Sequence, residues 1–164
     1  MKKAYLFGLI MVFLLIVFLT AKKETYYLKP QNATDSDGTD AADIINNIEN
    51  GYEMVSLKAN PYGYVEVSNF KPNSIVTNAY AEFDWKAYKD TGVSNIYIGY
   101  SFGNQYKEIG PFDYSTMQTI KIPVNIFTDF SKLKLRIRGE DSDFGADAIA
   151  EVSIKLQVTE LKIL

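Results

Sequence analysis

Tyr80, Glu82 and Asp84 occupy alternate positions of the stretch 74–88, and Tyr97 lies in the next such stretch, residues 94–102. If both stretches are strands, Tyr80, Glu82 and Asp84 share the outward face of the first, and Tyr97 lies outward on the second. Exposed aromatic rings can stack on sugar rings while polar neighbours bind the hydroxyls. These four residues are therefore candidates for a glycan-binding surface. The competing interpretation is structural, because strands are rich in aromatic residues whatever their function.

Two acidic loops are candidates for a calcium site. Asp35, Asp37 and Asp40 belong to the first loop, and Asp141 and Asp143 belong to the second. Calcium takes roughly six to eight oxygen ligands, which clustered carboxylates and loop carbonyls can supply. The spacing does not match an EF-hand loop. Asp and Ser also populate ordinary turns, so a purely conformational explanation competes with calcium binding.

The residue types that most enzymes use for proton transfer and nucleophilic attack are scarce. The chain contains no His and no Cys, so it lacks the commonest general base and the thiol nucleophile. Glu82 and Asp84 share a face and could form a glycosidase pair, but nothing in the sequence assigns them separate acid and base roles. No glycine-rich phosphate loop is present. We expect a protein that is not an enzyme.

The clearest alternation of apolar and basic residues lies in the stretch KLKLRIR, residues 132–138. Its apolar members are expected to point inward and its basic members outward. Such a row is typical of a solvent-facing or edge strand, and an anion-binding role is the alternative. The basic residues are Lys132, Lys134, Arg136 and Arg138.

Alternation with a period of two continues along most of the chain after residue 24, which is typical of half-buried strands. Turn signals recur about every 8–12 residues, a spacing that indicates an antiparallel sandwich or barrel. In the long stretch 74–88, Ile75, Phe83 and Trp85 are expected to share the inward face. Residues 31–40 are predicted to be a turn-rich connection, followed by a short helix over 41–48. The predicted strands, eight or nine in number, cover 25–29, 52–58, 62–70, 74–88, 94–102, 106–109, 117–126, 132–138 and 148–158.

The N-terminal segment, residues 1–23, has a different character from the rest. Ala4 to Ala21 is apolar apart from Gly8 and Thr20, and lysines flank it on both sides. A membrane helix needs roughly 20 such residues, so we expect an N-terminal anchor over residues 4–21. The alternative is a signal peptide cleaved after Ala21, although the apolar run is long for one. The domain then covers residues 24–164.

The orientation of that anchor follows from weaker signals. Lysines flank both ends almost equally, so the positive-inside rule is nearly balanced. The short segment before the helix and the sequon Asn32-Ala33-Thr34 favour an extracytoplasmic domain at the cell membrane.

The charge balance restricts the partners. The chain has a net charge of −3, and the part beyond the flanking lysines is more acidic still. Nucleic-acid binding needs a basic footprint, so it is not expected. An acidic domain also disfavours peripheral binding to anionic lipid. The absence of Cys excludes disulfides and a lipoprotein anchor.

The chain contains, in this order, the segments DGTDAADIINNI, VEVSNFKPNSIVTNAYAEFDWKAY, NIYIGYSFGNQYKEIGP and FTDFSKLKLRIRGEDSDFGADAIAEVSIKLQVTE. Their order resembles jelly-roll, galactose-binding-like modules of prokaryotic cell-surface and phage-associated proteins. The resemblance covers roughly residues 27–160, and it implies an all-β, antiparallel jelly-roll β-sandwich of two packed sheets. It implies no enzymatic activity. Such modules bind glycans or serve as structural decoration.

Three functions remain open at this point. The first is a membrane-anchored extracytoplasmic protein with a non-enzymatic structural, adhesion or envelope-interaction role, whose partner is an envelope protein or a glycan. The second is a glycan-binding module, stabilised by calcium in one version. The third is a minor subunit of a surface appendage, against which the missing prepilin processing site weighs.

Overall fold

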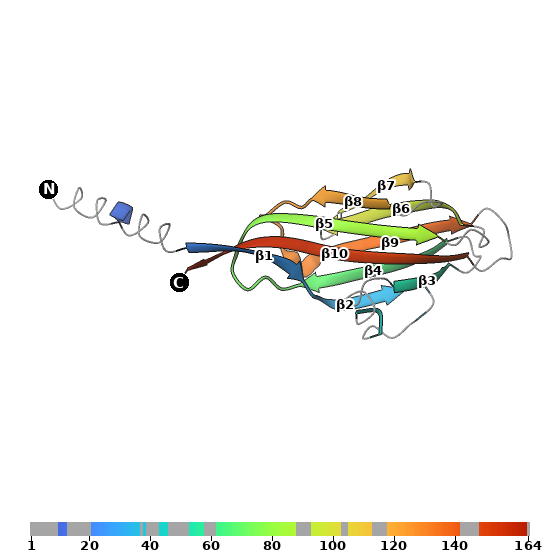
Figure 1. Cartoon of the computed structure of the whole chain (residues 1–164), viewed down its shortest axis with the longest axis horizontal. Helices are drawn as coiled ribbons and strands as arrows, with labels where there is room; N and C mark the ends of the chain where they lie inside the picture. The colour runs from blue at the N-terminus through green and yellow to red at the C-terminus, as the bar shows by residue number, and fades with distance from the viewer. Residues whose placement is uncertain are drawn as a thin grey trace.

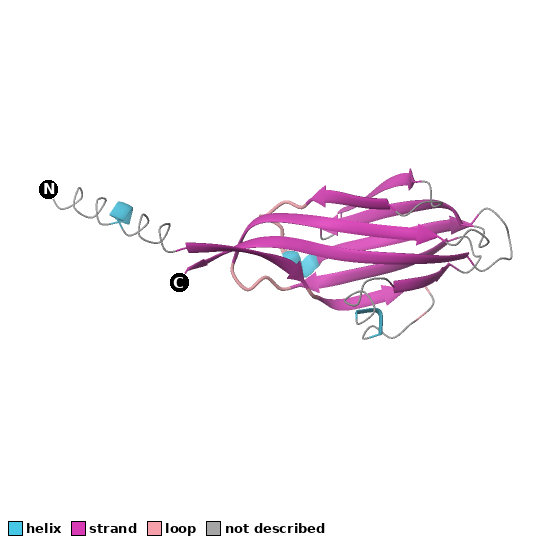
Figure 2. Ribbon diagram, in the orientation of Figure 1, coloured by secondary structure: helices cyan, strands magenta, loops and turns pink. Residues whose placement is uncertain are grey.

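The computed structural model describes residues 10–12, 21–36, 38, 43–45, 53–57, 62–87, 93–102, 105–112, 118–141 and 148–163. Strands dominate these ranges, and their pairing is antiparallel throughout (Figure 2). A short 3-10 helix, η1 (Phe130–Lys132), precedes the ninth strand. The strands are β1 (Ala21–Leu28), β2 (Pro30–Asp35), β3 (Glu53–Leu57), β4 (Tyr62–Phe70), β5 (Ile75–Ala87), β6 (Val93–Phe102), β7 (Gln105–Phe112), β8 (Gln118–Pro123), β9 (Leu133–Asp141) and β10 (Ala148–Ile163).

The strands form two sheets that pack face to face as a β-sandwich (Figure 1). The first sheet has the order β1-β10-β5-β8. β3 also pairs with β10, so β1 and β3 lie one after the other along the same edge of that strand. The second sheet has the order β2-β4-β9-β6-β7. Along the chain, β4, β5 and β6 alternate between the two sheets, and so do β7, β8, β9 and β10. This winding is consistent with the predicted jelly roll. The predicted antiparallel, all-β sandwich is confirmed.

The core fills the space between the sheets with inward side chains from both. Trp85 of β5 and Phe112 of β7 come from different sheets, and their ring centroids are 5.4 Å apart. The inward positions predicted for Trp85 and for the apolar residues of 132–138 are confirmed, because all of them are buried. Other buried members are Leu28, Val65, Val67, Phe70, Phe83, Ile96, Ile98, Ile154, Leu156 and Val158.

A β-bulge corrects one inward prediction on β5. Leu161 pairs with Ile75 and Thr159 pairs with Asn78, so the register shifts between Thr159 and Glu160. The extra residue in β5 inverts the alternation before the bulge. Val76 therefore packs against the core, whereas Ile75, predicted to be inward, is 61% exposed.

The segment predicted as a turn after residue 30 contains a strand. Pro30–Asp35 forms β2, which pairs with β4 at the edge of the second sheet. Ala33 is its buried contribution to the core, while Asn32 and Thr34 are exposed. A strand with so few apolar residues is held by main-chain pairing with its neighbour, which leaves little hydrophobic pattern to detect.

The N-terminal predictions fall mostly outside the described residues. Of residues 4–21, the structure describes Ile10–Val12, which are helical, and Ala21, which begins β1 and pairs with Ile163. Within the described ranges, no helix has the length and apolar character needed to cross a membrane. Of the helix expected over 41–48, residues 43–45 are described and helical, and Ile44 is fully buried.

Replacing Leu135 with alanine tests the core. Leu135 is fully buried, so Leu135→Ala should lower the free energy of unfolding by about 2–5 kcal/mol through lost burial and a residual cavity. Urea unfolding followed by the fluorescence of Trp85, the single tryptophan, measures the change. Lys107→Ala, an exposed change on β7, should stay within about 0.5 kcal/mol. Equal effects of the two variants would contradict the assigned core.

Candidate functional site

The outer face of the second sheet carries a row of tyrosines and arginines from four adjacent strands. Directly opposed residues of antiparallel strands point to the same side of a sheet. Arg138 of β9 is opposite Tyr64 of β4 and Tyr97 of β6. The intervening Ile137 and Ile98 are buried, so these polar side chains face outward. Together with Arg136 and Tyr106, we call this set the tyrosine–arginine face.

Arg136 lies between two tyrosine rings. Its guanidinium carbon is 4.4 Å from the ring centroid of Tyr64 and 5.2 Å from that of Tyr106. Its Nε and Nη2 donate to Glu66 Oε2 at 3.0 and 2.6 Å. Glu66 is thereby buried although it belongs to the outer face. Because Arg136 is held by Glu66 and by both rings, the stack Tyr64–Arg136–Tyr106 is pre-organised across the sheet.

Gly99 determines where the ring of Tyr106 lies. Tyr106 belongs to the edge strand β7, but its phenol end extends over Gly99 of the neighbouring strand β6. A Cβ added at Gly99 would overlap the Tyr106 Oη and would be 2.5 Å from its Cζ. The glycine therefore provides the space in which this ring lies against the sheet. Tyr106 remains 42% exposed, and partial burial raises the pKa of its phenol.

Arg138 connects the second half of the face. Its Nε and Nη2 donate to both carboxylate oxygens of Glu108 at 2.9 and 2.8 Å, and its Nη1 donates to Glu140 Oε1 at 2.6 Å. Its guanidinium carbon lies 4.1 Å from the ring centroid of Tyr97. The Tyr97 hydroxyl donates to Glu140 Oε2 at 3.1 Å. This bidentate and aromatic packing fixes the guanidinium plane.

Protonation states across this network follow from its contacts. The hydrogen bond from Arg138 holds the pKa of Glu140 below its usual range, with a smaller contribution from Tyr97. Glu108 raises the pKa of the Arg138 guanidinium. Partial burial, followed by the bond to Glu140, raises the pKa of the Tyr97 phenol. These contacts favour the ionised form of Glu140, the charged form of Arg138 and the protonated form of Tyr97.

Opposite charges balance one another on this face. Lys134 Nζ is 3.1 Å from Glu66 Oε1, so Glu66 binds both a lysine and Arg136. Arg138 is neutralised in the same way by two glutamates. Each basic side chain of β9 that faces outward here is thus in contact with at least one carboxylate. The arrangement offers directional donors and acceptors without a large excess of either charge.

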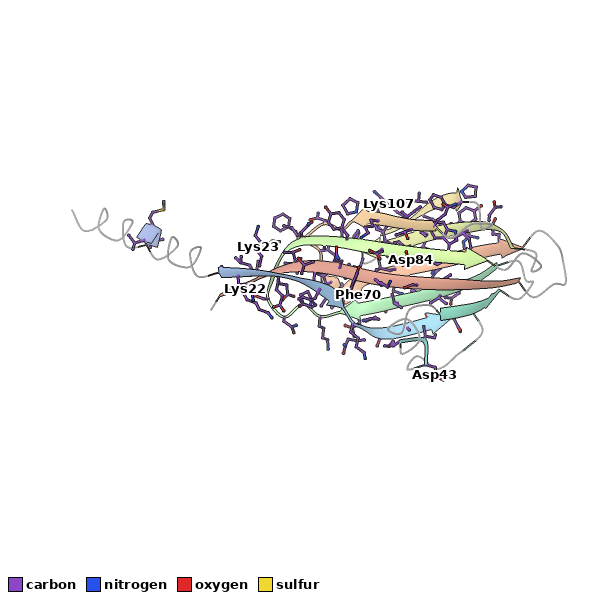
Figure 3. The ribbon with its side chains drawn as sticks, in the orientation of Figure 1. Lys22, Lys23, Asp43, Phe70, Asp84 and Lys107 are labelled. Carbon is purple, nitrogen blue, oxygen red and sulfur yellow. The ribbon has the colours of Figure 1, made fainter. Side chains whose placement is uncertain are left out.

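The structure separates the four residues predicted as a glycan surface. Tyr97 lies on the tyrosine–arginine face, whereas Tyr80, Glu82 and Asp84 lie on β5, on the outer face of the other sheet. Figure 3 labels Asp84 on this strand. The two groups are therefore on opposite sides of the sandwich. Alternation predicts which residues of a strand point outward, but it does not show which sheet the strand joins.

The β5 carboxylates are enclosed by lysines of neighbouring strands. Glu82 pairs with Lys121 at 2.7 Å, and Asp84 pairs with Lys155 at 3.4 Å. Asp84 also accepts a hydrogen bond from Thr119 at 2.5 Å. Glu82 and Asp84 are 7% and 5% exposed, so neither presents an open carboxylate to a ligand.

The calcium candidates are only partly described. Asp35 is the last residue of β2 and Asp141 is the last residue of β9. Asp37, Asp40 and Asp143 lie outside the described residues. Among the side chains that the structure does describe, no three acidic residues are grouped to hold a metal ion. The calcium site stays a prediction.

Sequence reasoning missed most of the tyrosine–arginine face. Arg136 and Arg138 were recognised as an outward basic row, but their carboxylate partners on β4 and β7 were not. Tyr64 and Tyr106 were not singled out. The available signal was the alternation of polar and aromatic residues in 64–66 and 106–108, which only the strand order connects to β9.

Comparisons with known proteins assign the chain to no family. No protein-family model matches the chain, and no curated protein matches its sequence. Similar solved structures include chitosan-binding module 1 of a chitosanase/glucanase from Paenibacillus sp. IK-5, with a TM-score of 0.49 and 11% identity, covering 79% of this chain and 95% of that chain.

Two further structures are similar to a comparable degree. The Streptococcus pneumoniae beta-galactosidase BgaA has a TM-score of 0.47 and 13% identity, covering 81% of this chain and 98% of that chain. A variant of the family 29 carbohydrate-binding module CBM29-2 has a TM-score of 0.45 and 14% identity, covering 84% of this chain and 85% of that chain. At these identities the likeness concerns the β-sandwich fold alone.

The lowered pKa of Glu140 predicts a pH-dependent stability difference. A carboxyl whose folded pKa is depressed stabilises the fold above its unfolded pKa, here 4.5, and loses that contribution as pH falls through the folded value. The free energy of unfolding of the wild type should therefore exceed that of Glu140→Gln by about 0.2–1 kcal/mol at neutral pH. The difference is small because solvent screens a pair whose glutamate side chain is 36% exposed. The advantage should disappear in acid.

Urea unfolding of both chains between about pH 7 and pH 3 measures this difference. Asp43→Asn, which changes an exposed carboxylate on a different segment, is the matched control. A stability difference for Glu140→Gln that does not change with pH would show that its ionisation is not coupled to Arg138.

Proposed function

We propose that this chain is a non-enzymatic glycan-binding module whose ligand lies across the tyrosine–arginine face. The observation that carries the proposal is the stack of Tyr64, Arg136 and Tyr106, in which a half-exposed tyrosine lies over Gly99. The C–H faces of a sugar ring pack on such an aromatic surface, and its hydroxyls pair with flanking charged groups. A glycan also supplies a chemical partner for the envelope-contact role predicted from the sequence.

The charge balance favours an uncharged glycan. Arg138 already donates through three nitrogens to Glu108 and Glu140, and Arg136 donates through two to Glu66. A polyanion would have to displace these carboxylates and leave them without their partners, which costs free energy. Neutral hydroxyls can instead share the remaining donor and acceptor positions. Binding should therefore depend little on salt concentration.

Binding without hydrolysis fits the state of the carboxylates. A glycosidase needs one carboxylic acid that remains protonated near neutral pH and a second that is ionised. On the tyrosine–arginine face, Arg138 instead lowers the pKa of Glu140. On the opposite face, Glu82 and Asp84 contact lysines. The contact with Arg138 therefore disfavours Glu140 as a proton donor.

We also propose that residues 4–21 anchor the protein in the cell membrane with the domain on the extracytoplasmic side. The support is the apolar run itself and its flanking lysines. A glycan-binding face on such a domain would hold envelope polysaccharide beside the membrane.

Tyr106 and Gly99 provide a matched pair of tests. Tyr106→Ala removes the ring, and Gly99→Ala displaces it while leaving it in the chain. Each should weaken binding about tenfold, equivalent to about 1.4 kcal/mol. Because the group that must move for Gly99→Ala is the far end of a side chain, this variant should unfold at nearly the wild-type temperature. Alanine at both positions should cost no more than Tyr106→Ala alone.

Binding is measured with the full chain in a detergent without a sugar headgroup, against soluble xylan, mannan, galactan and β-glucan. Alginate and heparin serve as anionic comparisons. Tyr80→Ala, on the opposite face, is the control and should bind as wild type does. If no polysaccharide binds, or if Tyr80→Ala weakens binding as much as Tyr106→Ala, the proposed site is wrong. Binding confined to the anionic glycans would overturn the neutral class.

A further inference from the structure

One end of the sandwich exposes large apolar side chains. Phe127 is 91% exposed and Ile126 is 36% exposed, and both belong to the connection between β8 and η1. Ile75, at the first position of β5, is 61% exposed. A single exposed apolar residue is ordinary on a protein surface, but several at one end indicate a contact surface.

The strand register places these residues at the end where the N-terminal segment enters. Ala21, the first residue of β1, pairs with Ile163 near the end of β10. Ile75 pairs with Leu161, only two positions away along β10. The connection that carries Phe127 leaves β8 where the Val124 amide donates to the carbonyl of Ala79, and it then turns toward the same end (Figure 1).

The connection is built to hold Phe127 outward. Asn125 Oδ1 accepts from the Phe127 amide at 3.0 Å, and the Asn125 carbonyl accepts from Thr128 at 3.0 Å. Asp129 then caps η1 by accepting from the Ser131 amide at 3.2 Å. Phe130 is buried in the core. The buried Phe130 therefore fixes the connection, whereas Phe127, three positions earlier, is exposed to solvent.

The same end is basic on a chain that is acidic overall. Three carboxylates lie among its lysines. Glu24 pairs with Lys162, Asp129 pairs with Lys132 at 3.3 Å, and the buried Glu160 accepts from the Asn73 amide at 2.9 Å. The net charge of the whole chain is −3, so the sequence average conceals this local excess of positive charge. The exposed lysines at this end are Lys22, Lys23, Lys71, Lys132 and Lys162 (Lys22 and Lys23 in Figure 3).

We propose that this end of the sandwich, which we call the basic end, rests on the surface of a bilayer that contains anionic lipid. Phe127 and Ile126 enter the interfacial region, and the lysines lie at the headgroups. Apolar side chains gain free energy on leaving water, and each lysine near an anionic surface is attracted to the headgroups. The inference rests on the proposed anchor, because the apolar run of residues 4–21 leads directly into Ala21.

Attachment through the basic end would leave the tyrosine–arginine face accessible. The outer faces of both sheets run along the length of the sandwich, so they would extend away from the bilayer and remain accessible. The domain would then be held in one orientation by its end as well as by its tether.

A single-cysteine probe tests the contact. The chain contains no cysteine, so Phe127→Cys and Asp43→Cys each allow one environment-sensitive fluorophore at a defined site. Asp43 is exposed and lies at the side of the sandwich, well away from Lys22 and Lys23 (Figure 3). The full-length chain is reconstituted into vesicles of phosphatidylcholine and phosphatidylglycerol that carry nitroxide-labelled lipid. The probe at 127 should shift its emission to the blue and lose fluorescence to the nitroxide, whereas the probe at 43 should do neither.

The outcomes separate this inference from the two proposals above. Vesicle flotation reports the anchor, and polysaccharide binding in detergent reports the glycan site. If the chain floats with the vesicles but both probes report water, the basic end does not contact lipid and the inference is overturned, while the anchor stands. If the chain does not float, anchor and basic end fail together. Replacing phosphatidylglycerol by phosphatidylcholine should reduce quenching at 127, and unchanged quenching would overturn the role of the lysines.

Discussion

The inward packing of β9 is the constraint on which the rest of the described structure depends. Leu133, Leu135 and Ile137 are buried between the sheets. Because side chains alternate along a strand, this burial forces Arg136 and Arg138 onto the outer face. β9 lies between β4 and β6, so the arginines meet partners on both sides. A shift of one residue would bury both charges and expose the core, which is why the register is firmly specified.

The two outer faces of the sandwich use charge differently. On the first sheet, the β5 carboxylates are covered by lysines and little of them reaches solvent. On the second sheet, the glutamates lie beside arginines that are also stacked on tyrosine rings. A lysine is a point charge on a flexible stem, whereas a guanidinium plane can pack on a ring and donate in fixed directions. The second face is therefore better organised to recognise a ligand.

Much of the fold could be read from alternation, but the site could not. The strands that contain Trp85 and Leu135 were predicted with their inward residues, because a buried apolar face leaves a period of two in the sequence. β2 was missed because main-chain pairing with β4, rather than an apolar pattern, holds it. Ile75 was predicted to be inward because a β-bulge cannot be recognised from the residue types around it. Tyr106 was missed because its ring depends on Gly99, a residue of another strand.

The sequence by itself determined an antiparallel, all-β domain, most of the inward residues of its long strands, and the absence of the thiol and imidazole groups that many active sites use. These properties are local, since each follows from residue type and spacing along one strand. Only the tertiary structure decided that Tyr97 and Tyr80 lie on opposite sides and that Arg138 reaches Glu108. It also brought lysines from distant segments to one end of an acidic chain. Strand order and register depend on burial summed over both sheets, so they cannot be read from any single strand.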